Sequence, residues 1–117
     1  MNIEQTAEIM KTILEDKKAL DVEVIPVGQK TTLADFFIIA TGGSLPHIRA
    51  LADELQLQMK TKHGLQPDHV EGYDGGRWIL LDYLDIVVHV FHQEDREYYS
   101  LEKLWEGRRH RSPETDG

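Results

Sequence analysis

The stretch from Glu71 to Phe91 constrains the fold more than any other, because it predicts two β-strands joined in a hairpin. Placing a tight turn at Leu84-Asp85 gives the hairpin one wholly apolar face. The apolar pairs across the strands are Tyr83 with Ile86, Leu81 with Val88, and Ile79 with Val90. Since side chains alternate between faces along a strand, we expect these residues to form part of the core.

The opposite face of the hairpin mixes aromatic, aliphatic and charged side chains. Its pairs are Trp78 with Phe91, Leu80 with His89, and Asp82 with Val87. Such a mixture is unusual for a solvated surface and is typical of one that contacts another molecule. The competing interpretation is that helices of the same domain cover this face, and at this point the two interpretations are evenly balanced.

The composition is that of one soluble globular domain. The chain has 117 residues, of which 40% are hydrophobic and 29% charged, and its apolar runs are too short to cross a membrane. The acidic residues near the N-terminus argue against a signal peptide. The absence of cysteine excludes disulfides, zinc–thiolate sites and thiol catalysis, so we expect a cytoplasmic protein.

The charge balance argues against a broad nucleic-acid surface. The formal net charge is −8, whereas binding to bare RNA requires clustered lysine and arginine. The one basic cluster, residues 108–111, is short and allows at most a minor contact with RNA. A basic protein is therefore the favoured partner, although acidity can also serve solubility alone.

The hydrophobic periodicity predicts helices and strands in the order α-β-β-α-β-β-β-α. We expect helices at 2–18 and from Ser44 to Gly64, and a helical turn or two after residues 94–97 that Gly107 stops. We expect strands at 21–27, 35–41 and 68–72 besides the hairpin. The fold class is α/β, a single-domain mixed-sheet α/β sandwich over residues 1–107. Residues 108–117 form a polar tail that we expect to be disordered.

Local signals place the ends and neighbours of these elements. Asn2 with Gln5 forms a capping box, and Ser44 caps the second helix, which glycine ends at Gly64. Pro26 predicts an edge strand, because proline cannot donate to a ladder. Residues 35–41 are apolar on both faces, so we expect a central strand covered on both sides, followed by a right-handed crossover to 68–72.

No motif predicts catalysis, a metal or a cofactor. Gly42-Gly43-Ser44 could bind phosphate at a helix start, but a tight turn and a cap are the preferred explanation. Nucleotidyltransferases also open a helix with Gly-Ser, yet they need carboxylates gathered on adjoining strands. Asp82 and Asp85 would point to opposite faces across a tight turn. The six histidines lack metal-ligand spacing, so His89 is expected to be a polar contact residue.

Three segments of the chain, taken in order, form a specific pattern. The first runs from Ala34 to Gly42, followed by Ser44 and His47; the second contains Glu71-Gly72, Gly76, Trp78, Leu80 to Tyr83 and Asp85 to Phe91; the third contains Arg96, Tyr99, Leu101-Glu102 and Leu104-Trp105. Together these segments resemble the ribosomal silencing factors, the family related to Iojap. The resemblance covers residues 21–105. The chain departs from the family at Gly43, where serine is frequent, and at Leu84, where glycine is usual. Leucine resists the positive φ of a two-residue turn, so a longer turn and a one-residue slip in pairing become possible outcomes.

The resemblance implies a nucleotidyltransferase-like fold without catalytic carboxylates, and a binding role without cofactors or metals. Family members dock on the large ribosomal subunit at its fourteenth protein and sterically block joining of the small subunit, which represses translation. They are often homodimers when free. The alternatives from the residues are a nucleotide-binding or nucleotidyltransferase enzyme, and a dimerising protein-interaction adaptor.

Combining the resemblance with the hairpin pattern gives a candidate partner-binding set. Trp78 and Leu80 are expected to be the apolar anchor, with Trp78 partly exposed. Polar and charged contacts are assigned to Asp82, Tyr83 and His89. The adjoining edge is assigned to Arg96, Tyr99, Glu102 and Trp105, the last of which we expect to be mostly buried.

Overall fold

Two helices and five strands form the part of the chain that the structure, a computed structural model, describes: residues 2–28 and 34–94. In chain order these elements are α1 (Ile3–Asp16), β1 (Asp21–Pro26), β2 (Phe36–Gly42), α2 (Leu45–His63), β3 (His69–Glu71), β4 (Trp78–Asp82) and β5 (Ile86–His92). Neither of these two helices is long and apolar enough to cross a membrane. The helical turns predicted before Gly107, the tail 108–117 and loop residues 29–33 lie outside the described residues.

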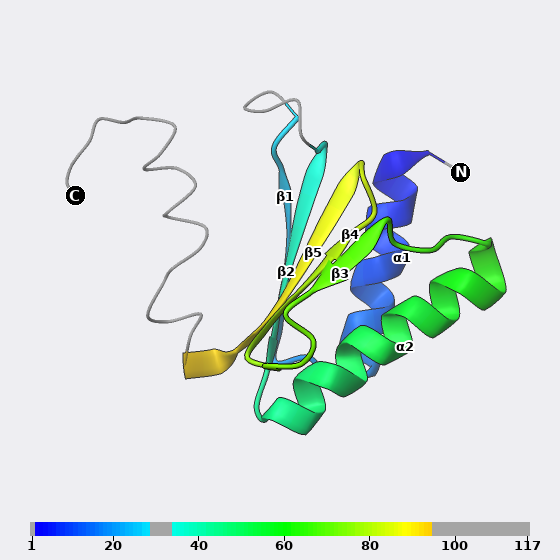
Figure 1. Cartoon of the computed structure of the whole chain (residues 1–117). Coiled ribbons are helices and arrows are strands. Elements are labelled where there is room, and N and C mark those ends of the chain that lie inside the picture. Colours follow the sequence, from blue (N-terminus) through cyan, green and yellow to red (C-terminus); the bar gives the residue numbers. More distant parts are fainter. Residues whose placement is uncertain (1, 29–33, 95–117) are drawn as a thin grey trace, which may run out of the picture.

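The five strands make one mixed sheet in the order β1-β2-β5-β4-β3 (Figure 1). The β2 and β5 strands are parallel, and every other neighbouring pair is antiparallel. Pro26 ends β1 at one edge of the sheet, as predicted. The crossover from β2 through α2 reaches β3, which runs parallel to β2 but lies at the far edge, with β5 and β4 between them.

The β4–β5 hairpin has the register that the alternation predicts. Trp78 pairs with Phe91, and each later pair follows without a slip. Leu84 adopts φ 73°, and the Tyr83 N–H donates to the Ile86 carbonyl at 2.8 Å. The tight turn predicted at Leu84-Asp85 is therefore confirmed, and the longer turn that leucine made possible does not form. The Asp82 carboxylate accepts a hydrogen bond from the Leu84 N–H at 2.7 Å, which stabilises the tight turn.

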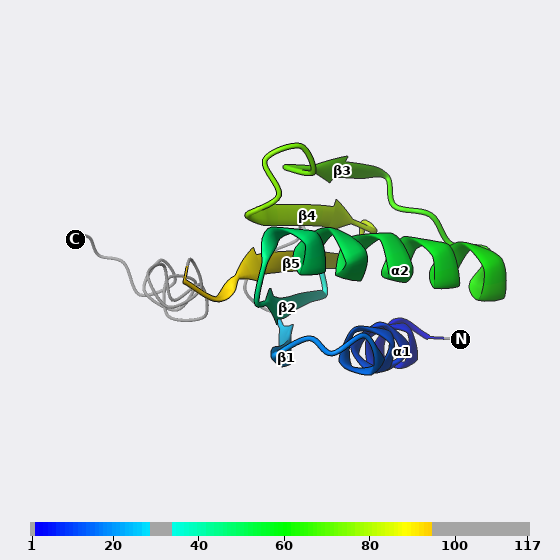
Figure 2. The same cartoon turned by 90° about the horizontal axis from the view of Figure 1, so that it is seen from below.

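Both helices pack on the same face of the sheet (Figures 1 and 2). The apolar face of the hairpin lies beneath them, as predicted, and Ile79, Leu81 and Val88 are fully buried. Fully burying one such side chain contributes about 1.5–3 kcal/mol. The helix α2 contributes the predicted stripe: Ile48, Leu51, Ala52, Leu55 and Met59. Within the described residues the fold thus has two layers, and the strand predicted to be covered on both sides receives helices on one.

The predicted helix caps are present. Asn2 and Gln5 form a reciprocal capping box, with Asn2 Oδ1 accepting from the Gln5 N–H at 2.7 Å. Ser44 caps α2, and Gly64 ends it with φ 65°. The first helix is shorter than the predicted 2–18, because Lys17 is its C-cap and Lys18 turns to φ 71°.

Candidate partner-binding surface

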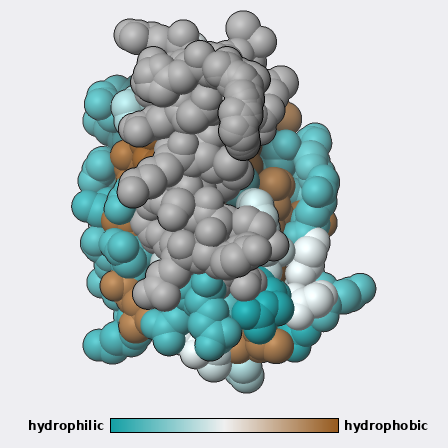
Figure 3. All heavy atoms as spheres, turned by 90° about the vertical axis from the view of Figure 1, so that its left-hand side faces the viewer, coloured by the Kyte–Doolittle hydropathy of each residue, from teal (hydrophilic) through white to brown (hydrophobic). Residues whose placement is uncertain are grey.

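The face of the sheet opposite the helices carries the candidate anchor residues. Alternation along β4 places Trp78, Leu80 and Asp82 on this face, and all three are half-buried. Figure 3 views the molecule from this side, where hydrophobic residues lie among hydrophilic ones. Trp78 is thus partly exposed, as predicted. The structure brings these three candidates together on one strand.

A small apolar cluster underlies the Trp78 indole. The rings of Trp78 and Phe91 stack with centroids 4.5 Å apart and planes inclined by 25°. Phe91 and Ile39 are fully buried, and Ile25 packs against them. Because close-packed side chains resist rearrangement, this cluster holds the indole on a firm base.

His89 lies inside this face, with 7% of its surface exposed. The Trp78 indole Nε1–H donates to His89 Nδ1 at 3.2 Å, and the Phe37 ring meets the imidazole edge-on at 5.1 Å. Burial lowers the pKa of His89 to about 4, so the imidazole is neutral at physiological pH. The sequence predicted a polar contact residue, whereas the structure places this side chain beneath the surface.

Tyr83 does not belong to this face. Its side chain lies on the helix-covered side of the sheet, in the main core, with 8% of its surface exposed. Burial raises the pKa of its hydroxyl to about 12. The hydroxyl oxygen has no hydrogen-bond partner within the described ranges. Alternation itself puts Tyr83 and Asp82 on opposite faces, so the assignment of both to one surface is wrong.

Carboxylates gather beside Asp82 at the edge of the sheet. The β3–β4 register pairs His69 with Asp82. His69 Nδ1 lies 3.1 Å from an Asp68 oxygen, and Nε2 lies 3.0 Å from Glu71 and 3.6 Å from Asp82. The hydrogen bond to Asp68 and the negative charges of Asp82 and Glu71 raise the pKa of His69. Sequence reasoning missed this cluster of His69 with three carboxylates. Only knowledge of the β3–β4 pairing would have indicated it.

The glycine-rich loop before Trp78 is held against α2. The Arg49 guanidinium donates to the Tyr73 carbonyl at 3.2 Å and to the Asp74 carbonyl at 2.7 Å. Gly72 has φ 80°, and a Cβ there would lie 2.2 Å from the Trp78 carbonyl oxygen. Only glycine therefore fits at position 72, where the loop passes close to the start of β4. Sequence reasoning also missed Arg49, which has no local signal.

The loop between β2 and α2 has a structural role. Ser44 Oγ accepts from the His47 N–H at 3.2 Å, as an N-cap does. His47 Nδ1 accepts from the Gly43 N–H at 3.2 Å, and its Nε2 lies 3.1 Å from the Lys17 carbonyl. The loop thereby joins the end of α1 to the start of α2. Among the described residues no group of three or more histidine, aspartate or glutamate side chains could hold a metal ion.

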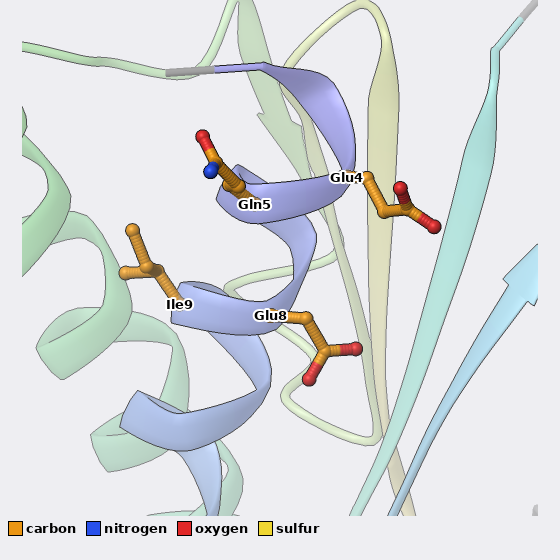
Figure 4. Close-up of a pocket in the computed structure, with 4 residues that line it drawn as sticks. All are labelled: Glu4, Gln5, Glu8 and Ile9. Carbon is orange, nitrogen blue, oxygen red and sulfur yellow. The ribbon is translucent and has the colours of Figure 1, made fainter.

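A depression of about 500 Å³ lies on α1, lined by Glu4, Gln5, Glu8 and Ile9. Figure 4 shows the two glutamates pointing to one side of the helix and Gln5 and Ile9 to the other. All four lining residues come from one helix, so their polar groups do not converge on a point as they do in ligand pockets. The depression therefore does not compete with the hairpin face as a candidate site. Arg96, Tyr99, Glu102 and Trp105 lie outside the described residues.

Comparisons with known proteins agree on one family. The family model for RsfS, described as the ribosomal silencing factor during starvation, matches residues 1–116. The ribosomal silencing factor RsfS of Bacillus subtilis is 39% identical over 105 residues, which cover 90% of this chain and 88% of that protein. An Iojap-related mitochondrial protein of Arabidopsis thaliana is 42% identical over 101 residues, covering 82% of this chain and 54% of that protein.

A solved structure shows the same fold. The crystal structure of a Chromobacterium violaceum protein superposes with a TM-score of 0.85 at 33% identity, and the match covers 100% of this chain and 95% of that one. The family match spans nearly the whole sequence and contains the hairpin, its aromatic cluster and the glycine-rich loop. The chain therefore belongs to the Iojap-related family of ribosomal silencing factors.

Proposed function

We propose that this protein binds the large ribosomal subunit at its fourteenth protein and sterically blocks association with the small subunit. Translation is repressed as a result, in the cytoplasm, by occupancy alone and without catalysis or a cofactor. Membership in the ribosomal silencing factor family supports the ribosome as the target. The choice of ribosomal protein follows the family resemblance stated above.

The observation that carries the proposal is the mixed apolar and acidic face of the hairpin. Trp78 and Leu80 are half-buried on the side of the sheet opposite both described helices. Tryptophan in a partly desolvated, well-packed setting is enriched among the residues that dominate binding energy. The firm base of Phe91 and Ile39 limits the entropy that Trp78 loses on docking.

Charge supports a basic protein as the partner. The chain has a formal net charge of −8. Asp82, Glu71 and Asp68 place carboxylates at the edge of the surface, next to Leu80. Complementary charge accelerates encounter and selects among partners more than it adds affinity. We therefore assign Trp78 and Leu80 to affinity and the carboxylates to partner choice.

The remaining candidates have separate roles in this proposal. Arg96, Tyr99, Glu102 and Trp105 form the adjoining edge of the surface or hold the hairpin in place. His89 lies beneath the surface and accepts a hydrogen bond from the Trp78 indole. In the free protein, the same apolar face serves a homodimer, which docking on the ribosome replaces.

Binding of variants to purified large subunits tests the assignment. Trp78→Ala should weaken binding by about 2 kcal/mol or more, roughly 30-fold in Kd, as expected for a hot-spot residue. Leu80→Ala should weaken binding less. The matched control is Leu57→Ala, because Leu57 is an apolar residue of α2 with 57% of its surface exposed, on the other side of the sheet.

Circular dichroism and thermal unfolding of each variant establish that it is folded before binding is measured. The proposal requires a loss in Trp78→Ala with no change in Leu57→Ala. Equal binding of Trp78→Ala and the wild type would show that the hairpin face is not the docking site. A matching loss in Leu57→Ala would place the docking site on the helical face instead.

A further inference from the structure

We propose that His89 is a positioning residue, which holds the Trp78 indole in the orientation that the docked partner meets. His89 does not itself touch the partner. This inference rests on the proposed function, because it concerns how the anchor of that docking surface is presented. His89, which the sequence assigned to direct contact with the partner, thus instead supports the Trp78 side chain.

Two contacts define the orientation of the Trp78 indole. Stacking on Phe91, with ring centroids 4.5 Å apart, sets the plane of the indole. The hydrogen bond from Nε1 to His89 Nδ1, at 3.2 Å, sets the rotation of the ring within that plane. The two supporting residues lie on β5, directly and diagonally across from Trp78. Indole rotation is thus fixed by a directional polar contact that packing alone does not supply.

The hydrogen bond determines the tautomer of His89. Since Nδ1 accepts the indole proton, the imidazole must be neutral and must carry its own hydrogen on Nε2. Burial favours the same neutral state and lowers the pKa of His89 to about 4. The Phe37 ring, edge-on to the imidazole at 5.1 Å, fixes the ring from the other side.

His89 is a costly residue for the fold. Its Nε2 atom is buried and has no hydrogen-bond partner among the residues that the structure describes. A buried donor without an acceptor is destabilising, whereas leucine or valine would fill a strand position among Phe37, Phe91 and Trp78 without that penalty. Features that lower stability without a packing gain are concentrated at functional sites. A role in holding Trp78 accounts for histidine at this position.

The same geometry defines the chemistry of the partner at this point. Because the indole N–H is already bound to His89, Trp78 offers ring carbon atoms to the partner. Leu80, two residues along the same strand face, extends that apolar area. The complementary group on the partner is therefore an aliphatic or aromatic side chain, and not a hydrogen-bond acceptor for the indole.

Two substitutions at His89 separate positioning from packing and from direct contact. In His89→Asn the amide oxygen can accept the indole proton from the position of Nδ1, whereas His89→Leu fills the space without an acceptor. We expect His89→Leu to unfold at an equal or higher temperature and to bind large subunits about five- to tenfold more weakly, the worth of about one hydrogen bond. His89→Asn should bind within about threefold of the wild type.

NMR of the wild-type protein gives a readout that does not depend on any variant folding. The expected results are a ¹⁵N coupling across the hydrogen bond between Trp78 Nε1 and His89 Nδ1, and a His89 imidazole protonated at Nε2. In His89→Leu the Trp78 indole resonance should shift, and in His89→Asn it should stay near the wild-type position. Trp78→Phe assigns the resonance, because it removes one of the two indole signals in the sequence.

Three outcomes would overturn the inference. These are wild-type binding by folded His89→Leu, an equal loss of binding in folded His89→Asn and His89→Leu, and a His89 protonated at Nδ1 in the wild type. The second outcome would mean that the imidazole itself contacts the partner. Failure of the proposed function has a different signature: the wild type would not bind large subunits, or Trp78→Ala would bind as well as the wild type. The NMR result on the wild type would stand in either case.

Discussion

Leu84→Gly should stabilise the hairpin that carries the docking surface. Leu84 has φ 73°, in the left-handed region, which costs a non-glycine residue about 1–2 kcal/mol. Its side chain is 60% exposed, so glycine removes little packing. The greater freedom of glycine in the unfolded chain offsets about 0.5–1 kcal/mol of that gain. The net expectation is a free energy of unfolding higher by about 0.5–1 kcal/mol.

Urea and thermal unfolding followed by circular dichroism measure this effect. A gain of that size should raise Tm by about 2–6 °C in a domain of this length. Leu84→Ala is the matched control, because alanine removes the same exposed side chain but keeps the unfavourable φ. The backbone hydrogen bond from residue 84 to Asp82 is available in both variants.

The reasoning would be refuted if Leu84→Gly were no more stable than the wild type. It would also be refuted if Leu84→Ala gained as much, since the gain would then come from losing an exposed leucine. Because the register is already that of a tight turn, neither variant should change binding to large subunits. A change in binding would mean that the turn itself contacts the ribosome.

Three other predictions follow from single contacts. Gly72→Ala should destabilise the fold by more than about 2 kcal/mol in urea unfolding, because its Cβ would meet the Trp78 carbonyl oxygen at 2.2 Å. Ser44→Ala should cost about 1 kcal/mol through loss of the α2 cap, with subunit binding unchanged. The raised pKa of His69 stabilises the fold below its unfolded value of 6.5, and this contribution is lost as pH rises through the folded pKa. Unfolding between pH about 6 and 8 should therefore show the wild type losing stability relative to His69→Asn, and parallel curves would contradict this.

Much of the fold was predictable from the sequence because its signals are local. Period-two alternation determined which side of the hairpin enters the core and which side carries Trp78 and Leu80. Helical periodicity gave the buried stripe of α2, and Asn2, Ser44 and Gly64 marked helix ends through their own backbone chemistry. In each case the residues that decide the structure lie within a few positions of one another.

The features that escaped prediction depend on contacts between distant segments. Arg49 holds a loop that follows it by more than twenty residues, and His69 meets Asp82 only because β3 pairs with β4 at the sheet edge. The location of β3, separated from β2 by two other strands, likewise has no local signal. At Leu84 the propensity of leucine argued against the tight turn that forms, because strand pairing on both sides outweighs a local cost of about 1–2 kcal/mol.

Subunit joining is the most direct test of the central claim. Purified large and small ribosomal subunits are mixed with and without this protein and separated on a sucrose gradient. The account predicts that the protein comigrates with large subunits and lowers the fraction of joined ribosomes, and that Trp78→Ala does neither at the same concentration. A protein that stays at the top of the gradient while joining proceeds unchanged would contradict the account.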